Sequence, residues 1–126
     1  MITQLITDDS PIVALKVTGS VTMDDIATFE RLFAKKKNEH KAVNVLIDLS
    51  EWQVRGSSLR AGLRERIWGV QNVSSMGRVA IVGWSAWLRA IVGLEAMALG
   101  RLNPSASQRY FDVKEIDKAW EFVRGE

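Results

Sequence analysis

The chain has 126 residues, a hydrophobic fraction of 47% and a formal net charge of +2, which are values typical of a globular protein, and we predict a single domain over residues 1–126. It has no cysteine, which excludes a disulfide framework and a thiolate metal site. The first nine residues lack the basic start and the long apolar run of a signal peptide, so we expect a cytoplasmic protein.

The start of the chain predicts a β-hairpin followed by a helix. Residues 2–6 and 12–17 are short runs of strand formers, and the turn-forming residues 8–11 separate them. Thr22 lies three residues before Asp25, which is the spacing of a helix capping box. The expected buried face of this helix has apolar side chains at helical spacing: Ile26, Phe29 and Phe33, with Leu32 beside them. We expect the helix to end in solvent at the three lysines Lys35, Lys36 and Lys37, because cations suit the negative end of a helix dipole.

Residues 43–47 predict a strand that is buried on both faces, because strand formers follow one another almost without interruption. The strand breaks at Asp48-Leu49-Ser50, and a loop over 51–56 follows. These polar groups lie at the carboxyl end of the strand, where open α/β sheets usually place their sites. A second helix is expected from Ser57 or Ser58, since serine suits an N-cap.

The second helix carries two stripes at helical spacing. The stripe expected to pack on the sheet is apolar: Leu59, Leu63, Ile67 and Val70. The neighbouring stripe contains Arg60, Arg64 and Trp68. Either Trp68 covers the edge of the core while the arginine stems lie along it, or the stripe is a contact surface of the kind found at binding hot spots and membrane interfaces.

The positive charge of the chain is concentrated in its middle. Residues 55–101 hold seven arginines and two glutamates, giving +5, whereas the segments on either side are slightly acidic. This excess is either ordinary surface charge or a patch for phosphate groups on lipid headgroups or nucleic acid. The lysine-rich segment 35–41 is interrupted by Glu39 and favours a solvated helix end, so we expect no nucleic-acid partner.

Residues 74–77 predict a turn, residues 78–83 a buried strand, and Ser85 the cap of a third helix over 86–99. This helix is apolar nearly all round, and only Arg89 and Glu95 interrupt it. It is too short for a membrane span, which needs roughly 20 apolar residues. It is therefore expected to lie in the core, against another subunit or at a membrane surface. The candidate contact residues in and beside this helix are Trp84, Trp87, Leu88, Arg89, Ile91, Leu94 and Arg101.

The end of the chain predicts a short strand over 108–111 and a final helix. Asp112 is expected to cap this helix, with Glu115 completing a capping box, and its buried face would hold Ile116, Ala119, Trp120 and Val123. The expected order of elements is β-β-α-β-α-β-α-β-α. This order predicts an α/β fold in which about four helices flank a mixed, mostly parallel sheet with an antiparallel edge.

Several segments together resemble the SpoIIAA-like branch of the STAS superfamily. They are residues 17–22 leading into the first helix, residues 45–49, residues 78–83 running into a tryptophan-containing helix, and Tyr110-Phe111-Asp112 before a helix with Ala119-Trp120. The resemblance implies the STAS-like fold and a small regulatory or binding module with no agreed enzymatic activity. It also implies membrane association, or binding of an apolar ligand between movable helices.

A phosphorylation switch is the more specific feature of anti-sigma-factor antagonists in this superfamily. These proteins carry Asp-Leu-Ser and then Asp-Ser-Ser-Gly, and the resemblance places the phosphoserine at Ser57. Here Gly56 replaces the aspartate and Leu59 replaces the glycine, so the motif is incomplete on both sides.

Catalytic and metal chemistry have little support in the sequence. His40 is the single histidine, which leaves no histidine metal cluster and only one candidate base for a catalytic triad. Gly83-Trp84-Ser85-Ala86-Trp87 lacks the final glycine of a nucleophile elbow, and no phosphate-loop pattern is present. We therefore predict a protein that is not an enzyme and has no cofactor.

Two functions remain as hypotheses. The first is a module that reversibly meets an anionic membrane surface, or binds an apolar, lipid-like ligand, through the third helix, with Arg60, Arg64, Arg89 and Arg101 contacting headgroups. The second is a protein-interaction module, either a homodimer formed through the third helix or a switch at Ser57.

Overall fold

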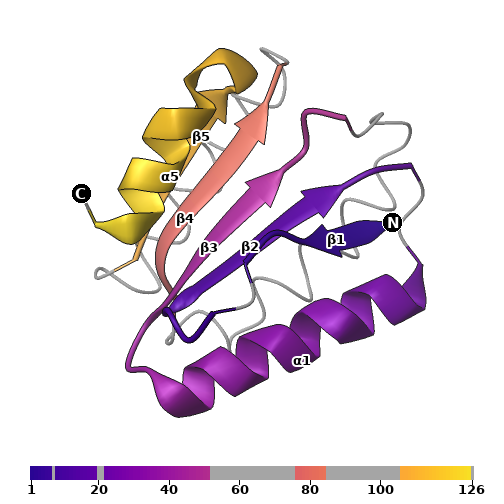
Figure 1. Cartoon of the computed structure of the whole chain (residues 1–126), viewed down its shortest axis with the longest axis vertical. Coiled ribbons are helices and arrows are strands. Elements are labelled where there is room, and N and C mark those ends of the chain that lie inside the picture. Colours follow the sequence, from indigo (N-terminus) through magenta and orange to yellow (C-terminus); the bar gives the residue numbers. More distant parts are fainter. Residues whose placement is uncertain (7, 20–21, 52–75, 85–105, 126) are drawn as a thin grey trace.

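A computed structural model describes residues 1–6, 8–19, 22–51, 76–84 and 106–125. Within these residues the core element is a five-stranded sheet with the order β1-β2-β3-β4-β5 (Figure 1). Its strands are β1 (Ile2–Gln4), β2 (Ile12–Val17), β3 (Val43–Asp48), β4 (Met76–Gly83) and β5 (Ser107–Asp112). The helical elements are α1 (Met23–Glu39), the 3-10 helix η1 (Val113–Glu115) and α5 (Ile116–Arg124).

The pairing of the strands confirms the predicted mixed sheet. β1 is antiparallel to β2, and every following pair is parallel. The predicted helices that begin at Ser57 or Ser58 and that cover 86–99 lie outside the described residues. The predicted number and full order of helices therefore remain predictions.

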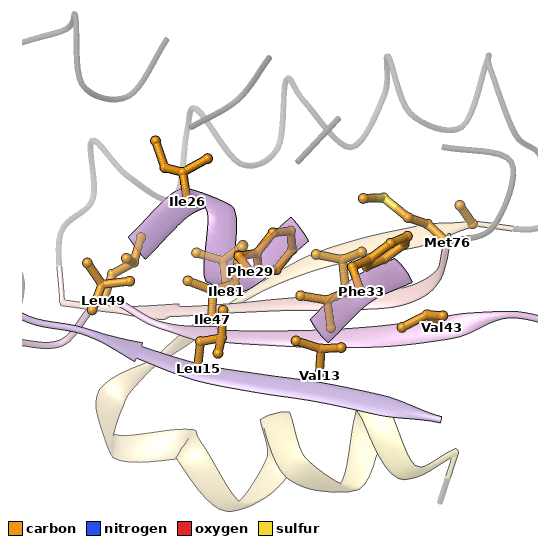
Figure 2. Close-up of a cluster of buried hydrophobic side chains, with 14 residues drawn as sticks. Val13, Leu15, Ile26, Phe29, Phe33, Val43, Ile47, Leu49, Met76 and Ile81 are labelled. Carbon is orange, nitrogen blue, oxygen red and sulfur yellow. The ribbon is translucent and has the colours of Figure 1, made fainter. Parts of the chain in front are cut away.

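One face of the sheet packs against α1. Figure 2 shows Phe29 and Phe33 of α1 beside the side chains of Leu15 and Ile47. The two phenylalanine rings stack with their centroids 6.0 Å apart, and Phe33 is only 1% exposed. This confirms the apolar face predicted from the spacing of Ile26, Phe29 and Phe33. Residues at alternate positions of β2, β3 and β4 complete this layer, as the period of two in a strand requires.

The opposite face of the sheet packs against α5 (Figure 1). Ala119 and Val123 of α5 are fully buried there, whereas Trp120 and Ile116 are only partly buried at its margin. The sheet is thus covered on both faces, which explains why β3 is an almost continuous apolar run.

The start of α1 forms as its sequence predicts, and at its end Lys35 and Lys37 are exposed as predicted whereas Lys36 is not. Thr22 and Asp25 form a complete capping box at the N-terminus. At the other end, Lys36 is 6% exposed, so it is not part of a solvated helix end. Its Nζ donates to the main-chain oxygens of Asp8 and Ser10. Lys36 thereby holds the β1–β2 connection against α1.

Two other boundaries also differ from the sequence-based expectation. The sequence predicts residues 76–77 in a turn, but they begin β4. The register between β3 and β4 shifts between the pair made by Val43 and the pair made by Val45. The expected Asp112–Glu115 capping box does not form. Instead, Asp112 accepts from the main-chain N–H of Lys114 in η1, and the carboxylate of Glu115 pairs with Lys118.

Candidate functional site

The carboxyl ends of β3 and β4 lie side by side at one edge of the sheet (Figure 1). Asp48, the last residue of β3, is 4% exposed, and its Oδ1 accepts from the main-chain N–H of Ser50 over 2.9 Å. The N–H of Leu49 donates to the main-chain oxygen of Val82 over 2.8 Å. The Asp48-Leu49-Ser50 segment is therefore a turn fixed to β4, and the Asp48 carboxylate serves to hold that turn.

An ion pair spans the same edge of the sheet. Lys16 of β2 is the register partner of Asp48, and its Nζ lies 3.0 Å from Oε2 of Glu51. The hydrogen bond to Glu51 is the main cause that raises the pKa of Lys16, and the charges of Glu51 and Asp48 add to the effect. The edge thus combines one ammonium with two carboxylates. Because this pair is near solvent, its attraction is screened by salt.

Apolar side chains lie exposed at the carboxyl ends of the next two strands along this edge, β4 and β5. Gly83 of β4 and Asp112 of β5 are register partners. The residues that follow them, Trp84 and Val113, are 61% and 37% exposed. An indole that is mostly in solvent at the mouth of a parallel sheet is available to contact a partner.

A comparison of the sequence with known protein families identifies the family of this fold. The SpoIIAA-like family model matches residues 12–124. The chain belongs to the SpoIIAA-like family. The matched span runs from the first residue of β2 to the last residue of α5, so it contains the whole parallel part of the sheet. Family membership confirms the resemblance and indicates a STAS-type regulatory or interaction module. Searches of curated proteins and of solved structures returned no match.

One predicted contact residue of this SpoIIAA-like domain, Trp84, lies among the described residues, where it is 61% exposed, and its role as a contact stays a prediction. The other candidates lie outside the described residues: Ser57, Arg60, Arg64, Trp68, Trp87, Leu88, Arg89, Ile91, Leu94 and Arg101. Their grouping into a site therefore stays a prediction.

A second group of residues was not predicted from the sequence. Arg78 of β4 and Arg109 of β5 lie over the ring of Phe122 in α5. Arg109 and Phe111 are two residues apart on one strand, a spacing that places them on the same face of the sheet. That spacing was the available signal, but it does not identify Phe122 as the common partner.

Two kinds of feature are absent from the parts of the chain that the structure describes. No cluster of three or more histidine, cysteine, aspartate or glutamate side chains is arranged to hold a metal ion there. Among the same residues, no helix has the length and apolar character needed to cross a membrane.

Proposed function

We propose that this SpoIIAA-like domain is a non-enzymatic regulatory module that associates reversibly with an anionic membrane surface or holds an apolar, lipid-like ligand. The observation that carries the proposal is the exposed indole of Trp84 at the carboxyl end of β4. Tryptophan is enriched at membrane–water interfaces, where its ring sits at the level of the headgroups.

The sequence around Trp84 supports the same function. Trp84 directly precedes the predicted apolar helix over 86–99, and it lies within the segment 55–101 that carries the excess of arginine. In the proposed arrangement Trp84, Trp87, Leu88, Ile91 and Leu94 supply the apolar contact. Arg60, Arg64, Arg89 and Arg101 supply attraction to anionic headgroups, and Trp68 lies at the margin. Such a protein would act peripherally at the cytoplasmic face of a membrane.

Co-sedimentation with vesicles of phosphatidylglycerol and phosphatidylcholine tests the proposal. We expect binding at low salt that weakens as salt is added, because salt screens the arginine charges. Trp84→Ala should weaken binding about tenfold, since burial of an aromatic side chain contributes roughly 1.5–3 kcal/mol. Met23→Ala is the matched control, because Met23 is 64% exposed but lies at the start of α1. Absence of vesicle binding at low salt rejects the membrane function.

The apolar-ligand version has its own test. Native mass spectrometry of the purified protein should detect a co-purified lipid-like molecule, and extraction of that molecule should lower the thermal midpoint, because a ligand stabilises the state that binds it. A protein that carries no such molecule and shows no stabilisation by added fatty acid would reject this version.

The second candidate function is protein interaction. Trp84 and Val113 are exposed apolar residues at the same edge of the sheet as the Lys16–Glu51 ion pair, and an aromatic anchor with a polar rim is typical of protein interfaces. The partner would be a second copy of the chain, or a protein whose binding responds to phosphorylation of Ser57. A monomeric mass at high concentration by sedimentation equilibrium rejects the homodimer. An unchanged set of bound proteins for Ser57→Asp rejects the switch.

A further inference from the structure

Two arginines share one phenylalanine ring on the α5 face of the sheet, near the edge formed by β5 (Figure 1). The Cζ atoms of Arg78 and Arg109 each lie 5.5 Å from the centroid of the Phe122 ring. Arg109 also lies 5.1 Å from the centroid of Phe111, whose ring is 5.6 Å from that of Phe122. Phe122 and Phe111 thus form an aromatic platform that the two guanidinium groups share, and both arginines are exposed. Arg78 and Arg109 are diagonal neighbours on adjacent strands, because Arg109 pairs with Ala80 and Arg78 with Ser107.

Hydrogen bonds with the main chain fix the positions of Arg78 and Phe122 relative to each other. Asn44 accepts from the main-chain N–H of Arg78 over 2.8 Å and donates to the main-chain oxygen of Val123 over 2.7 Å. The side chain of Arg78 donates from Nη1 to the main-chain oxygen of Phe122 over 3.1 Å. These bonds join β3, β4 and the last turn of α5, so the site is built on regular elements rather than on a loop.

The charge of this arginine pair is not neutralised within the part of the chain that the structure describes. Neither Arg78 nor Arg109 forms an ion pair with a carboxylate there. The carboxylate of Glu115 forms its ion pair with Lys118, which lies one turn before Phe122 on α5. Two like charges held beside one ring repel each other, and a bound anion would remove that repulsion.

We propose that Arg78 and Arg109 bind a phosphate group. A guanidinium presents a planar fork of N–H donors that matches phosphate oxygens, and a phosphate has enough oxygens to accept from two such forks at once. Arg109 makes no hydrogen bond within the described residues that would compete, and Arg78 uses one Nη1 donor of its five N–H groups. The phosphate belongs either to a small soluble organic phosphate or to a lipid headgroup. This site uses other residues than the proposed membrane contact and does not rest on it.

Binding of inorganic pyrophosphate, measured by isothermal titration calorimetry on the full chain, tests the proposal. Arg109→Gln should weaken binding about tenfold, because a charge-assisted hydrogen bond contributes roughly 1.5–3 kcal/mol. Arg109→Lys should give an intermediate loss, since lysine keeps the charge but not the planar fork. Arg124→Gln is the matched control, and it should change affinity less than twofold. Arg124 is also exposed and also stacks on one ring, at 5.2 Å from the centroid of Trp120.

The control removes the same charge at a different place. Arg124 lies over the ring of Trp120 rather than that of Phe122, so its substitution reports the effect of net charge. Equal losses of pyrophosphate affinity in Arg109→Gln and Arg124→Gln would overturn the proposal, because they would show that binding depends only on the net charge of the protein. Thermal melts of both variants should match the wild type, as expected for exposed side chains.

A second arm distinguishes the two sources of phosphate. The same variants are tested for binding to phosphatidylglycerol vesicles in the Trp84→Ala background. Loss of pyrophosphate binding in Arg109→Gln supports a soluble phosphate. Vesicle binding that depends on Arg109 and not on Arg124, without pyrophosphate binding, supports a headgroup. Failure of both probes overturns the site, and it leaves the function proposed for Trp84 to its own test.

Discussion

The side chain of Asn44 on β3 is bonded to Val123 of α5 through a 2.7 Å hydrogen bond from Nδ2 to the main-chain oxygen. Its other polar atom, Oδ1, accepts from the main-chain N–H of Arg78 on β4 over 2.8 Å. One amide group thus joins two strands and a helix. Both of its bonds go to backbone groups, whose donor and acceptor capacity is thereby satisfied within the protein.

Asn44→Ala is expected to lower the free energy of unfolding by about 2 kcal/mol, because it removes two hydrogen bonds, an exposed one from Arg78 and a partly buried one to Val123. Urea denaturation followed by circular dichroism measures the change. Asn38→Ala is the control, since Asn38 is exposed on α1 and alanine suits a helix. Equal stability of the two variants would contradict this account.

Gly77→Ala is expected to destabilise the protein through Asn44. A Cβ atom at Gly77 would lie 2.3 Å from Oδ1 of Asn44, so the side-chain amide of Asn44 must move. That movement weakens the bond that Oδ1 accepts from Arg78 and the bond that Nδ2 donates to Val123. We expect a loss of roughly 1–3 kcal/mol. In the Asn44→Ala background the obstacle is gone, and the same substitution should cost clearly less. A double-mutant cycle by urea denaturation measures this coupling, and additive effects would show that the contact with Asn44 is not the cause.

Lys36→Met should destabilise the β1–β2 connection while keeping most of the buried stem of the side chain. The substitution removes the donor for the main-chain oxygens of Asp8 and Ser10, and we expect a loss of about 2 kcal/mol. Hydrogen exchange should also become faster around residues 8–10. The control is Lys35→Met, because Lys35 is an exposed neighbour on the same helix. An unchanged exchange rate near Ser10 would be inconsistent with this role of Lys36.

Asp25 gives a stability contribution that depends on pH. The main-chain N–H of Thr22 donates to its carboxylate over 2.9 Å, and this bond is the main cause that lowers the pKa of Asp25 below its ordinary value of 3.8. Because the folded state holds this proton less tightly than the unfolded state, the contribution is fully present above pH 3.8. It disappears as the pH falls through the lowered pKa of the folded state.

Asp25→Asn should therefore cost about 1 kcal/mol at pH 7, the usual contribution of a helix cap, and less at pH 3. Guanidinium denaturation at the two pH values measures the difference. Asp24→Asn is the control, since Asp24 lies in the same first turn but outside the capping box. If Asp25→Asn lowered the free energy of unfolding equally at both pH values, the charge of Asp25 would not be the source of its stabilising effect.

The features that the sequence predicts correctly depend on short spacings along the chain. The capping box joins Thr22 and Asp25, which are three residues apart, and the buried face of α1 follows from one helical period. The alternation between sheet and helix predicts the parallel pairing, because parallel strands need a crossover connection. These signals are local, so a single sequence is sufficient to find them.

The features that the sequence did not predict depend on residues far apart in the chain. Lys36 bonds to residues 26 and 28 positions earlier, and its neighbours Lys35 and Lys37 give no sign that it differs from them. The Arg78–Phe122 bond spans 44 positions. Gly77 resembled a turn residue, but it is a strand position where glycine leaves room for Asn44. Such contacts depend on tertiary packing, which propensity and periodicity do not encode.

The short strand β1 has a consequence for how this domain behaves at high concentration. β1 pairs with β2 through Ile2–Val17 and Gln4–Leu15, and so it occupies the outer edge of β2 over residues 15–17, where Leu15 and Val17 are buried. An uncovered apolar edge strand is a template for pairing with other chains. β1 has three residues, of which Thr3 and Gln4 are exposed, so it offers little edge of its own. It therefore protects the sheet against strand addition between molecules and helps to keep the domain from aggregating.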